Sequence, residues 1–518
     1  MGETLAGLVD RNARQRAEAV AFRGDHHDLT WAAYKKLSDQ LAAHLLACGL
    51  ERGERLAVLL PDGPGVHIAY LAGEKAGLIV VGIGPRAGRE EVLHLLERSG
   101  ACALLAPPQH RDLDLGELCA ALAARDQPLR VVVSVEQALG PDDAIWETLP
   151  EPATLAGMRP RQSEETFLLN STSGTTGLPK CVAHHQDRWF AFHQPAVRNA
   201  ALVRTDIFCS ALPSPFGFGL WTAHFTPTIL GAVCVIPTHF DAEHLLGIIE
   251  RERVTVLAAV STQFILMLEH PDFDRFDLSS LRVLFTGGEA VPYTRAASFE
   301  ERTGAKVLQF YGSNEAGALS GTSVHDSREK RLRTAGRPLP EMRVRLFDTE
   351  GRETTDQRKG QPGCKGPQCS HGYWEDPDAN ALLFREDGWM LTGDIAEIDE
   401  EGYLSVVGRS ADFIIRGGKN ISGPIVEAAC LTLPSIRLAA AVAIPDAIFG
   451  ERVCLYVELH PGANLELPAL TKHLADQGTT KEYWPEVLIT DHPLPFSSGG
   501  KIAKEELRKD AAARVQTT

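Results

Sequence analysis

The sequence contains no apolar run that approaches the roughly 20 residues of a membrane-spanning helix. Its first residues, Met1–Asp10, lack the basic stretch and long apolar run of a secretory signal peptide. It also contains no internal repeat and no low-complexity tract. These absences exclude a membrane span from the prediction and favour a globular protein, which we expect in the cytoplasm.

The sequence has fewer basic than acidic residues. The chain carries 52 lysines and arginines against 68 aspartates and glutamates, which gives a net charge of -16 at pH 7. Because an acidic protein is repelled by phosphate backbones, we expect no nucleic-acid partner. The simplest interpretation of the acidic excess is solubility.

Metal-binding cysteine clusters are also missing from the sequence. Ten cysteines are scattered along the chain, and the closest pair, Cys364 and Cys369, lacks histidine partners at the spacing of zinc ligands. Reduced thiols in a cytoplasmic protein are therefore the better interpretation.

The order of apolar segments predicts the fold class. A chain of 518 residues is too long for one ordinary core, so at least two domains are expected. Short runs rich in Val, Ile and Leu alternate with helical stretches such as Asp241–Glu252 and Pro292–Thr303. Runs without apolar–polar alternation are typical of strands buried on both faces, which predicts an α/β protein with largely parallel sheets. The predicted strands are Arg55–Leu60, Ile79–Ile83, Val131–Val135, Asp206–Leu212, Ala232–Pro237, Val254–Val260, Val283–Thr286 and Val307–Phe310.

After about Gly408 the elements become shorter and more mixed, which predicts a small α+β domain of about 110 residues. Just before this domain, the Gly- and Cys-containing stretch Gly360–Gly372 is predicted to be a loop or turn region. The predicted elements of the small domain are the strands Asp412–Ile415, Leu438–Ile444 and Val453–Leu459 and the helices Pro424–Leu431 and Leu467–Gln477.

The strongest chemical signal is the segment Ser171–Lys180, which reads Ser-Thr-Ser-Gly-Thr-Thr-Gly-Leu-Pro-Lys and follows the apolar run Phe167–Leu169. Glycines let backbone N–H groups approach phosphate oxygens, hydroxyls donate hydrogen bonds, and the lysine neutralises charge. The spacing differs from the common P-loop because a proline separates Lys180 from Gly177. A Ser/Thr/Gly run is usually a flexible loop, but this ordered mixture favours a polyphosphate site.

Two acidic residues lie in segments that suit a nucleotide. Glu315 closes the segment Gln309–Glu315 after an apolar run, where a carboxylate could ligate Mg²⁺. Asp394 closes Gly388–Asp394 and could accept hydrogen bonds from ribose hydroxyls. Taken alone, Glu315 is better explained as a solvated loop glutamate, and the other interpretation of Asp394 is a turn aspartate. Three further polar segments follow in order: Gly408–Asp412, Arg416–Asn420 and Ser497–Lys501.

Taken together, the order and separation of these segments resemble the acyl-adenylate-forming superfamily, which includes acyl-CoA synthetases, adenylation domains of peptide synthetases and firefly luciferase. The resemblance extends from about Leu5 to Leu507. It implies a large N-terminal domain of mainly parallel sheets packed with helices, residues 1–409, and a small mobile α+β domain, residues 410–518. It also implies the use of ATP, Mg²⁺ and a thiol, either coenzyme A or the phosphopantetheine of a carrier protein.

The resemblance also assigns roles to individual residues. Glu315 would ligate Mg²⁺, and Asp394 and Arg409 would hold the ribose. Tyr311 would stack on adenine, and Lys501 would be the catalytic lysine that bridges the carboxylate and the α-phosphate. The other ATP-binding positions that it implies are Thr172, Ser173, Gly174, Thr175, Thr176, Gly177, Lys180, Gly288, Glu289, Gly312, Ser313 and Asn314, the last of which stands where the family usually has threonine.

The small domain departs from the family pattern in the part used for thiol transfer. Gly417 and Gly418 resemble the loop that lines the pantetheine tunnel, and Ala411 occupies the hinge position, where Asp or Lys is usual. Gly423 and Ile425 replace a usual proline and a usual glutamate. These differences bear on the identity of the thiol acceptor more than on adenylation.

The segment Leu212–Leu220 corresponds to the stretch that lines the acyl pocket in the family. Amino-acid-activating relatives carry an aspartate there to pair the ammonium, but no acid occurs between Ser210 and Phe240 in this chain. A charged substrate tail would cost several kcal/mol to desolvate, so we expect an apolar acid, aromatic, alicyclic or medium-chain. Ordinary core packing is the other interpretation of the pocket residues, which are Phe216, Phe218, Gly219, Phe285, Gly287, Ala318 and Leu319.

Three functions remain open at this point. The favoured one is an acyl-CoA ligase that forms AMP and pyrophosphate. The second is a free-standing adenylation enzyme that loads an acyl carrier protein. The third is a non-catalytic ligand-binding protein with the same fold, against which the joint presence of Lys180, Glu315, Asp394, Arg409 and Lys501 argues.

Overall fold

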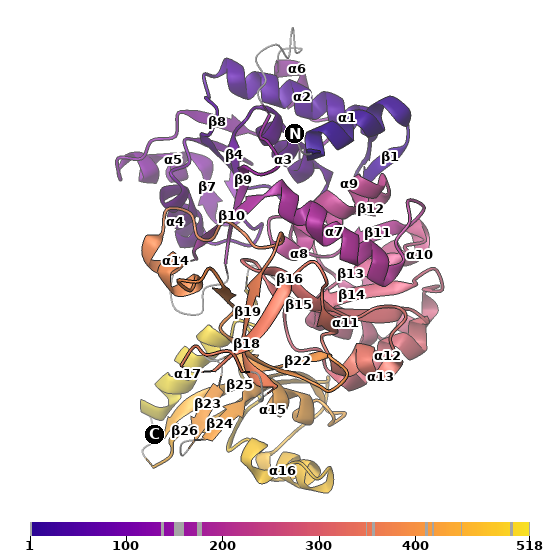
Figure 1. Ribbon diagram of the computed structural model, residues 1–518, viewed down its shortest axis with the longest axis vertical. Helices are drawn as coiled ribbons and strands as arrows, with labels where there is room; N and C mark the ends of the chain where they lie inside the picture. Colours follow the sequence, from indigo (N-terminus) through magenta and orange to yellow (C-terminus); the bar gives the residue numbers. More distant parts are fainter. Residues whose placement is uncertain are drawn as a thin grey trace.

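The computed structural model describes residues 3–135, 139–149, 160–172, 179–348, 350–354, 358–409, 413–416, 419–446, 448–497 and 501–516. Figure 1 shows an elongated molecule that runs from α1 (Leu5–Gln15) and α2 (Trp31–Ala47) at one end to α16 (Leu467–Asp476) at the other. Within these ranges, no helix combines the length and the apolar character that a membrane crossing requires.

The first sheet is largely parallel. Its described strands follow the order β10-β9-β4-β3-β5-β8, and only β9 and β10 pair antiparallel. β9 and β10 bracket the segment predicted to bind phosphates. The strands are β3 (Arg55–Val58), β4 (Ile79–Gly82), β5 (Ala103–Ala106), β8 (Val131–Ser134), β9 (Thr166–Ser171) and β10 (Cys181–His185).

The second sheet is the largest and has the strand order β17-β16-β15-β14-β13-β11-β12-β1-β2. The central run from β15 to β1 is parallel, whereas β2, β16 and β17 extend its two edges antiparallel. The strands are β1 (Val20–Arg23), β2 (Asp28–Thr30), β11 (Ile207–Ser210), β12 (Val233–Val235), β13 (Val256–Ala258), β14 (Val283–Gly287), β15 (Lys306–Ser313), β16 (Gly317–Gly321) and β17 (Arg337–Pro338).

Helices bury both faces of these sheets. In β3, Leu56 and Val58 belong to the apolar cluster that contains α3, whereas Ala57 between them belongs to the cluster that contains α4. Because both faces are covered, the parallel strands read as unbroken apolar runs. The principal helices are α3 (Pro64–Lys75), α4 (Arg89–Ser99), α5 (Leu115–Ala123), α7 (Gln186–Ala200), α10 (Ala242–Glu252), α11 (Ser261–Leu268), α12 (Tyr293–Thr303) and α13 (Arg328–Arg333).

The third sheet is antiparallel, with the order β18-β19-β21-β22 and β20 paired to β19. The prediction of a loop over Gly360–Gly372 is wrong for its first residues, which belong to β19. Glycine is needed there because a Cβ at Gly363 would lie 2.5 Å from the ring of Phe347 on the neighbouring strand. The strands are β18 (Arg343–Phe347), β19 (Lys359–Lys365), β20 (Met390–Leu391), β21 (Asp394–Ile398) and β22 (Leu404–Arg409).

The C-terminal part forms a separate sheet, with the order β24-β23-β26-β25 and β27 paired to β26. Its predicted strands and helices are confirmed, with bounds that differ by a few residues. The elements are β23 (Phe413–Arg416), β24 (Lys419–Ser422), α15 (Gly423–Cys430), β25 (Ile436–Asp446), β26 (Gly450–Leu459), α16 (Leu467–Asp476), β27 (Val487–Ile489) and α17 (Lys504–Gln516).

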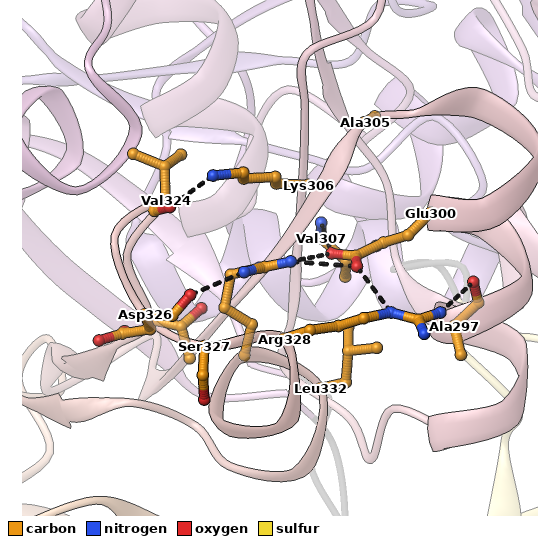
Figure 2. Close-up of polar contacts among 12 residues, drawn as sticks. Ala297, Glu300, Ala305, Lys306, Val307, Val324, Asp326, Ser327, Arg328 and Leu332 are labelled. Carbon is orange, nitrogen blue, oxygen red and sulfur yellow. Dashed lines mark hydrogen bonds and ion pairs between the residues drawn. The ribbon is translucent and has the colours of Figure 1, made fainter.

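A partly buried ion network anchors the start of β15, the strand that carries Tyr311. Glu300 of α12 accepts hydrogen bonds from Arg331 at 2.9 and 3.0 Å, from Arg328 at 3.2 Å and from the backbone N–H of Val307 at 2.9 Å. Figure 2 shows Arg328 reaching from Glu300 to the carbonyl oxygen of Ala297. The carboxylate therefore joins α12 and α13 to the first residues of β15.

The structure confirms the predicted α/β class. Each of the strands predicted from Arg55 to Phe310 overlaps an observed strand, and the helices predicted at Asp241–Glu252 and Pro292–Thr303 correspond to α10 and α12. The observed strands are mostly shorter because the apolar runs continue into the loops.

Candidate functional site

The site forms where β14 and β15 end. The turn Gly287–Glu289, which contains the predicted ATP-binding residues Gly288 and Glu289, begins at the last residue of β14, and Glu315 lies in the connection between β15 and β16. This edge requires close backbone contact, because a Cβ at Gly312 would lie 1.9 Å from the carbonyl oxygen of Gly317. Gly288 has a φ of 78°, a conformation that glycine adopts without strain.

Asp394 lies at the centre of a polar cluster that joins the second sheet to the third. The hydroxyl of Tyr311 donates to Asp394 Oδ2 at 2.7 Å, and Arg409 Nε donates to Asp394 Oδ1 at 3.1 Å. Asp394 and Arg409 are paired across β21 and β22. Burial and the nearby Asp394 carboxylate raise the pKa of Tyr311 well above its usual value, so the hydroxyl stays a donor.

Glu315 is held at both its backbone and its side chain. Its carbonyl oxygen accepts from Ser370 N at 2.7 Å, and its Oε1 accepts from the hydroxyl of Tyr373 at 2.8 Å. The ammonium of Lys180 lies 4.8 Å from the centre of the Tyr373 ring. The structure thus places the end of the predicted phosphate segment beside the predicted metal ligand.

Asn314 and Asn170 form a reciprocal amide pair. Asn314 Nδ2 donates to Asn170 Oδ1 at 2.6 Å, and Asn170 Nδ2 donates to Asn314 Oδ1 at 3.1 Å. Two charged or ionisable side chains support this pair. Arg188, which is buried, donates to Asn314 O at 3.0 Å, and His184 Nε2 hydrogen bonds Asn170 Oδ1 at 2.7 Å. Because these bonds hold Asn314 in place, β9 is tied directly to the end of β15.

Lys501 reaches the site from the C-terminal part of the chain. Its Nζ donates to the carbonyl oxygen of Gly288 at 2.6 Å. Burial lowers the pKa of Lys501, while the negative charge of Glu289 raises it part of the way back. Glu289 in turn accepts a hydrogen bond from Ser261 Oγ at 2.6 Å, which orients its carboxylate.

Four aromatic side chains pack together where the acyl pocket is predicted. The ring of Phe218 lies 4.7 Å from that of Phe310 at an angle of 81°, and Trp221 lies 4.7 Å from Phe285 at 76°. Phe218 and Trp221 stack with a separation of 5.7 Å. A small cavity is lined by Trp221, Phe285 and Phe310, among others. Edge-to-face packing of this kind forms an apolar wall that could contact a ring or a chain.

Other predicted pocket residues lie near this aromatic group. Gly287 faces Phe310, because a Cβ at Gly287 would lie 2.5 Å from the Phe310 carbonyl oxygen and 3.1 Å from its ring. Ala318 and Leu319 of β16 are buried in the same apolar cluster as Phe285. Gly219 lies in the short helix α8 (Gly217–Gly219), where a Cβ would lie 2.3 Å from the Pro213 carbonyl oxygen. Phe216 precedes that helix and is half-buried.

Comparison with known proteins agrees with this arrangement. Residues 9–374 match the AMP-binding enzyme family, a span that contains β9, β14, β15 and Glu315. The chain belongs to the AMP-binding enzyme family.

Similar proteins span almost the whole of this family member. Feruloyl-CoA synthase of an Amycolatopsis species is 32% identical over 504 residues, which cover 96% of this chain and 97% of that protein. Medium-chain fatty-acid–CoA ligase of Escherichia coli is 28% identical over 519 residues, which cover 99% and 91%. The crystal structure of an anthranilate CoA ligase in complex with anthranoyl-AMP matches with a TM-score of 0.89 over 99% and 98% at 22% identity, and shows the same fold.

Several predicted residues of this AMP-binding enzyme lie outside the described ranges. They are Ser173, Gly174, Thr175, Thr176 and Gly177 of the phosphate segment, Gly417 and Gly418 of the thiol tunnel, and Ala411 of the hinge. The two described ends of the phosphate segment do meet, because Thr172 N donates to Lys180 O at 3.0 Å. Of the other predicted ATP-site residues, Ser313 Oγ accepts from the backbone N–H of Ala316 at 3.1 Å.

The sequence did not point to every residue of the site. Tyr373, Thr392, Asn170 and Arg188 all contact predicted site residues through bonds between distant segments. The signal for Asn170 was its place at the end of a predicted strand, directly before the phosphate segment. A tyrosine after a Gly-containing stretch offers no such signal.

The residues present fit a magnesium ion that is held mainly by a nucleotide. The described part of the chain contains no group of three or more His, Cys, Asp or Glu residues that could enclose a metal. Mg²⁺ at nucleotide sites commonly takes one or two carboxylates and completes its shell with phosphate oxygens and water. Glu315, oriented by Tyr373, can supply one such carboxylate.

Proposed function

We propose that this AMP-binding enzyme activates an apolar carboxylic acid with ATP and then transfers the acyl group to the thiol of coenzyme A. The observation that carries the proposal is the meeting of Lys501, from the C-terminal part, with the turn Gly287–Glu289 and the cluster around Asp394. A cation, a metal-ligating acid and a ribose-binding acid are the groups that adenylation requires. The names of the similar proteins, which include CoA ligases for aromatic and aliphatic acids, support this assignment.

In the first step, a carboxylate oxygen attacks the α-phosphorus of ATP, and pyrophosphate leaves. Two anions must approach each other, so Lys501 neutralises the carboxylate and the α-phosphate together. Mg²⁺ bound at Glu315 would neutralise charge on the phosphate oxygens. Asp394 accepts hydrogen bonds from the ribose hydroxyls, and Arg409 keeps that carboxylate oriented.

In the second step, the thiol sulfur attacks the acyl carbon, loses its proton, and AMP leaves. This step needs no lysine on the α-phosphate. We propose that Lys501 moves away so that the groups for thiol transfer can approach the same reaction centre. We propose that residues 410–518 form a small domain that turns about a hinge near Ala411, which brings Gly417 and Gly418 toward the thiol. The ATP site on residues 1–409 stays assembled through both steps.

The acyl pocket determines the class of acid. Phe218, Trp221, Phe285 and Phe310 offer aromatic edges and faces, and the stretch between Ser210 and Phe240 offers no carboxylate for an ammonium. We propose an aromatic, alicyclic or medium-chain acid without a charged tail. An unpaired ammonium in this pocket would cost several kcal/mol.

The alternative acceptor is the phosphopantetheine of a carrier protein, which presents the same thiol. Gly423 and Ile425 lie on α15 of the small domain, where they differ from the usual family residues. Ile425 is exposed. An exposed apolar residue suits a protein partner better than a nucleotide, so this alternative belongs in the test.

The deciding experiment measures AMP and pyrophosphate release with a panel of acids: benzoate, cyclohexanecarboxylate, hexanoate and phenylalanine. Each acid is tested with coenzyme A, with a phosphopantetheinylated carrier protein, or with no thiol. We expect neutral acids to be activated and coenzyme A to accelerate AMP release. If only the carrier protein accelerated AMP release, the acceptor would be the carrier protein and not coenzyme A. If phenylalanine were the only acid activated, the pocket assignment would be contradicted.

A further inference from the structure

Two thiols lie side by side where β19 ends, and the second directly precedes Ser370, whose backbone N–H bonds the carbonyl oxygen of Glu315. Cys364 is near the end of β19, and Cys369 follows in the turn after it, where its backbone N–H donates to Gly366 O at 3.2 Å. The two sulfur atoms are 3.8 Å apart. A disulfide bond of about 2.05 Å therefore requires an approach of roughly 1.8 Å, which is a local movement.

The surroundings give the two thiols different reactivity. Cys364 is fully buried, whereas Cys369 is only half-buried. The hydrogen bond from the Cys364 thiol and the positive charge of Arg188 lower the pKa of Cys369, against the effect of burial. Because the thiolate is the nucleophile, Cys369 is the residue that attacks an oxidant, and Cys364 is placed to react with the product.

The segment that carries Cys369 also holds the edge of the ATP site. Ser370 N donates to Glu315 O at 2.7 Å, and Tyr373 donates to the Glu315 carboxylate at 2.8 Å. The side chain of Gln368 accepts from Ala318 N at 3.1 Å. Movement of residues 368–370 is therefore transmitted to Glu315 on one side and to the acyl pocket on the other.

Residues 368–370 can move little without displacing the residues packed against them. A Cβ at Gly317 would lie 2.7 Å from both the Cβ and the carbonyl oxygen of Gln368, so the two backbones are already in contact. Closely packed segments shift together because the interior has few voids.

We propose that Cys364 and Cys369 are a redox-sensitive modification site, which forms an intramolecular disulfide on exposure to a hydroperoxide and thereby slows adenylation. The Cys369 thiolate attacks one oxygen of hydrogen peroxide, the O–O bond breaks, and the leaving hydroxide takes up a proton to become water. Cys369 is then a sulfenic acid. The sulfur of Cys364 attacks the sulfenic sulfur, the S–S bond forms, and a second water leaves with the Cys364 proton. Two thiols are oxidised, and one peroxide is reduced to two waters.

The disulfide is detected by mass spectrometry before any activity is measured. The reduced full-length enzyme is exposed to hydrogen peroxide, the remaining thiols are alkylated, and the digest is analysed for a peptide that links Cys364 to Cys369. We expect this link to form faster at about pH 8 than at about pH 6, because more Cys369 is then thiolate. Absence of the link, while the exposed Cys48 is oxidised, would overturn the proposal.

The second readout is ATP–pyrophosphate exchange with the best acid of the panel, and this part rests on the proposed function. We expect oxidation to lower exchange by at least about tenfold and dithiothreitol to restore it. Cys369→Ser and Cys364→Val should lose less than about twofold on oxidation, while Cys48→Ser should behave as the unmodified enzyme. If no acid is activated, calorimetric affinity for Mg²⁺–ATP in the reduced and oxidised forms replaces exchange, so that failure of the proposed function is recognised separately. A disulfide without either effect, or inhibition that persists in Cys369→Ser, would contradict the coupling.

Discussion

At the scale of single residues, Lys501 shows how environment adapts a common side chain to a task. It reaches Gly288 from a distant part of the sequence, and its pKa is lowered by burial. The proposed role requires the charged form, which predominates only below the pKa. The same burial that strengthens its charge interactions therefore narrows the pH range in which it acts.

We predict that kcat/KM for adenylation falls as pH rises through the lowered pKa of Lys501. The decline should begin at a lower pH than for a lysine with an ordinary pKa. Lys501→Arg should abolish this decline because arginine stays charged. Thioester formation from a supplied acyl-adenylate should show no such decline. The measurement is a pH profile of each half-reaction, with the exposed Lys509→Ala as the control. A decline that survives in Lys501→Arg would assign the titration to another group.

Asp394 is the second residue whose replacement is informative. Asp394→Ala removes a charged acceptor, and hydrogen bonds to a charged group are worth roughly 1.5–3 kcal/mol each. The KM for ATP in pyrophosphate release should therefore rise by at least about tenfold. Glu397→Ala, on the same strand and ion-paired with Lys359, is the matched control. An unchanged ATP dependence in Asp394→Ala would remove the ribose assignment.

At the scale of elements, the parallel strands were predictable because burial on both faces leaves unbroken apolar runs. The antiparallel strands β16 and β19 were not, since Gly317–Gly321 and Lys359–Lys365 contain the small residues typical of turns. Their pairing depends on partners far along the chain. For the same reason, the sequence indicated Glu315 and Asp394 but not Tyr373, which orients Glu315.

The segment Leu212–Leu220 supports a prediction about substrate choice. Phe218→Asp places a carboxylate against Phe310 and Trp221, so activity on neutral acids should fall by well over about tenfold. Phe218→Leu, which keeps the pocket apolar, should lose much less. The measurement is the specificity constant for benzoate and hexanoate. Equal activity of Phe218→Asp and the unmodified enzyme would show that the substrate acid binds elsewhere in the protein.

The network between α12, α13 and β15 supports a prediction about stability. Glu300→Ala leaves the buried Arg331 without its carboxylate partner, which should lower the free energy of unfolding by about 3–5 kcal/mol. Glu301→Ala removes an exposed pair with Arg328 and should change it by less than about 1 kcal/mol. Denaturant unfolding followed by fluorescence compares the two variants. If Glu300→Ala lowered the free energy of unfolding by as little as Glu301→Ala, the network would contribute little to stability.

At the scale of the whole molecule, the arrangement depends on contacts between the two proposed domains. Glu269, which follows α11, pairs with Arg295 and lies 3.3 Å from Nε2 of His460. Arg295 also donates to Ile436 O at 3.2 Å. These contacts join Ile436 and His460 of the C-terminal sheet region to α11 and α12, in the arrangement in which Lys501 contacts Gly288.

We predict that Glu269→Ala weakens this arrangement and slows adenylation by about tenfold or less, while thioester formation from a supplied acyl-adenylate is spared or accelerated. Each half-reaction is measured separately under single-turnover conditions. Glu243→Ala, which removes an exposed contact with His270, is the control. A parallel loss in both half-reactions would argue that the contact serves stability rather than the choice of domain position.

The amide pair between Asn170 and Asn314 has a consequence for how such a protein can change over generations. Asn170 has a second partner for each of its amide atoms, because Oδ1 also hydrogen bonds His184 Nε2 at 2.7 Å and Nδ2 also donates to Pro215 O at 2.7 Å. Both hydrogen bonds described for the half-buried side chain of Asn314 go to Asn170. The two positions therefore depend on each other unequally. A lineage can exchange Asn314 while both amide atoms of Asn170 keep a partner, whereas loss of Asn170 removes both hydrogen bonds described for the Asn314 side chain.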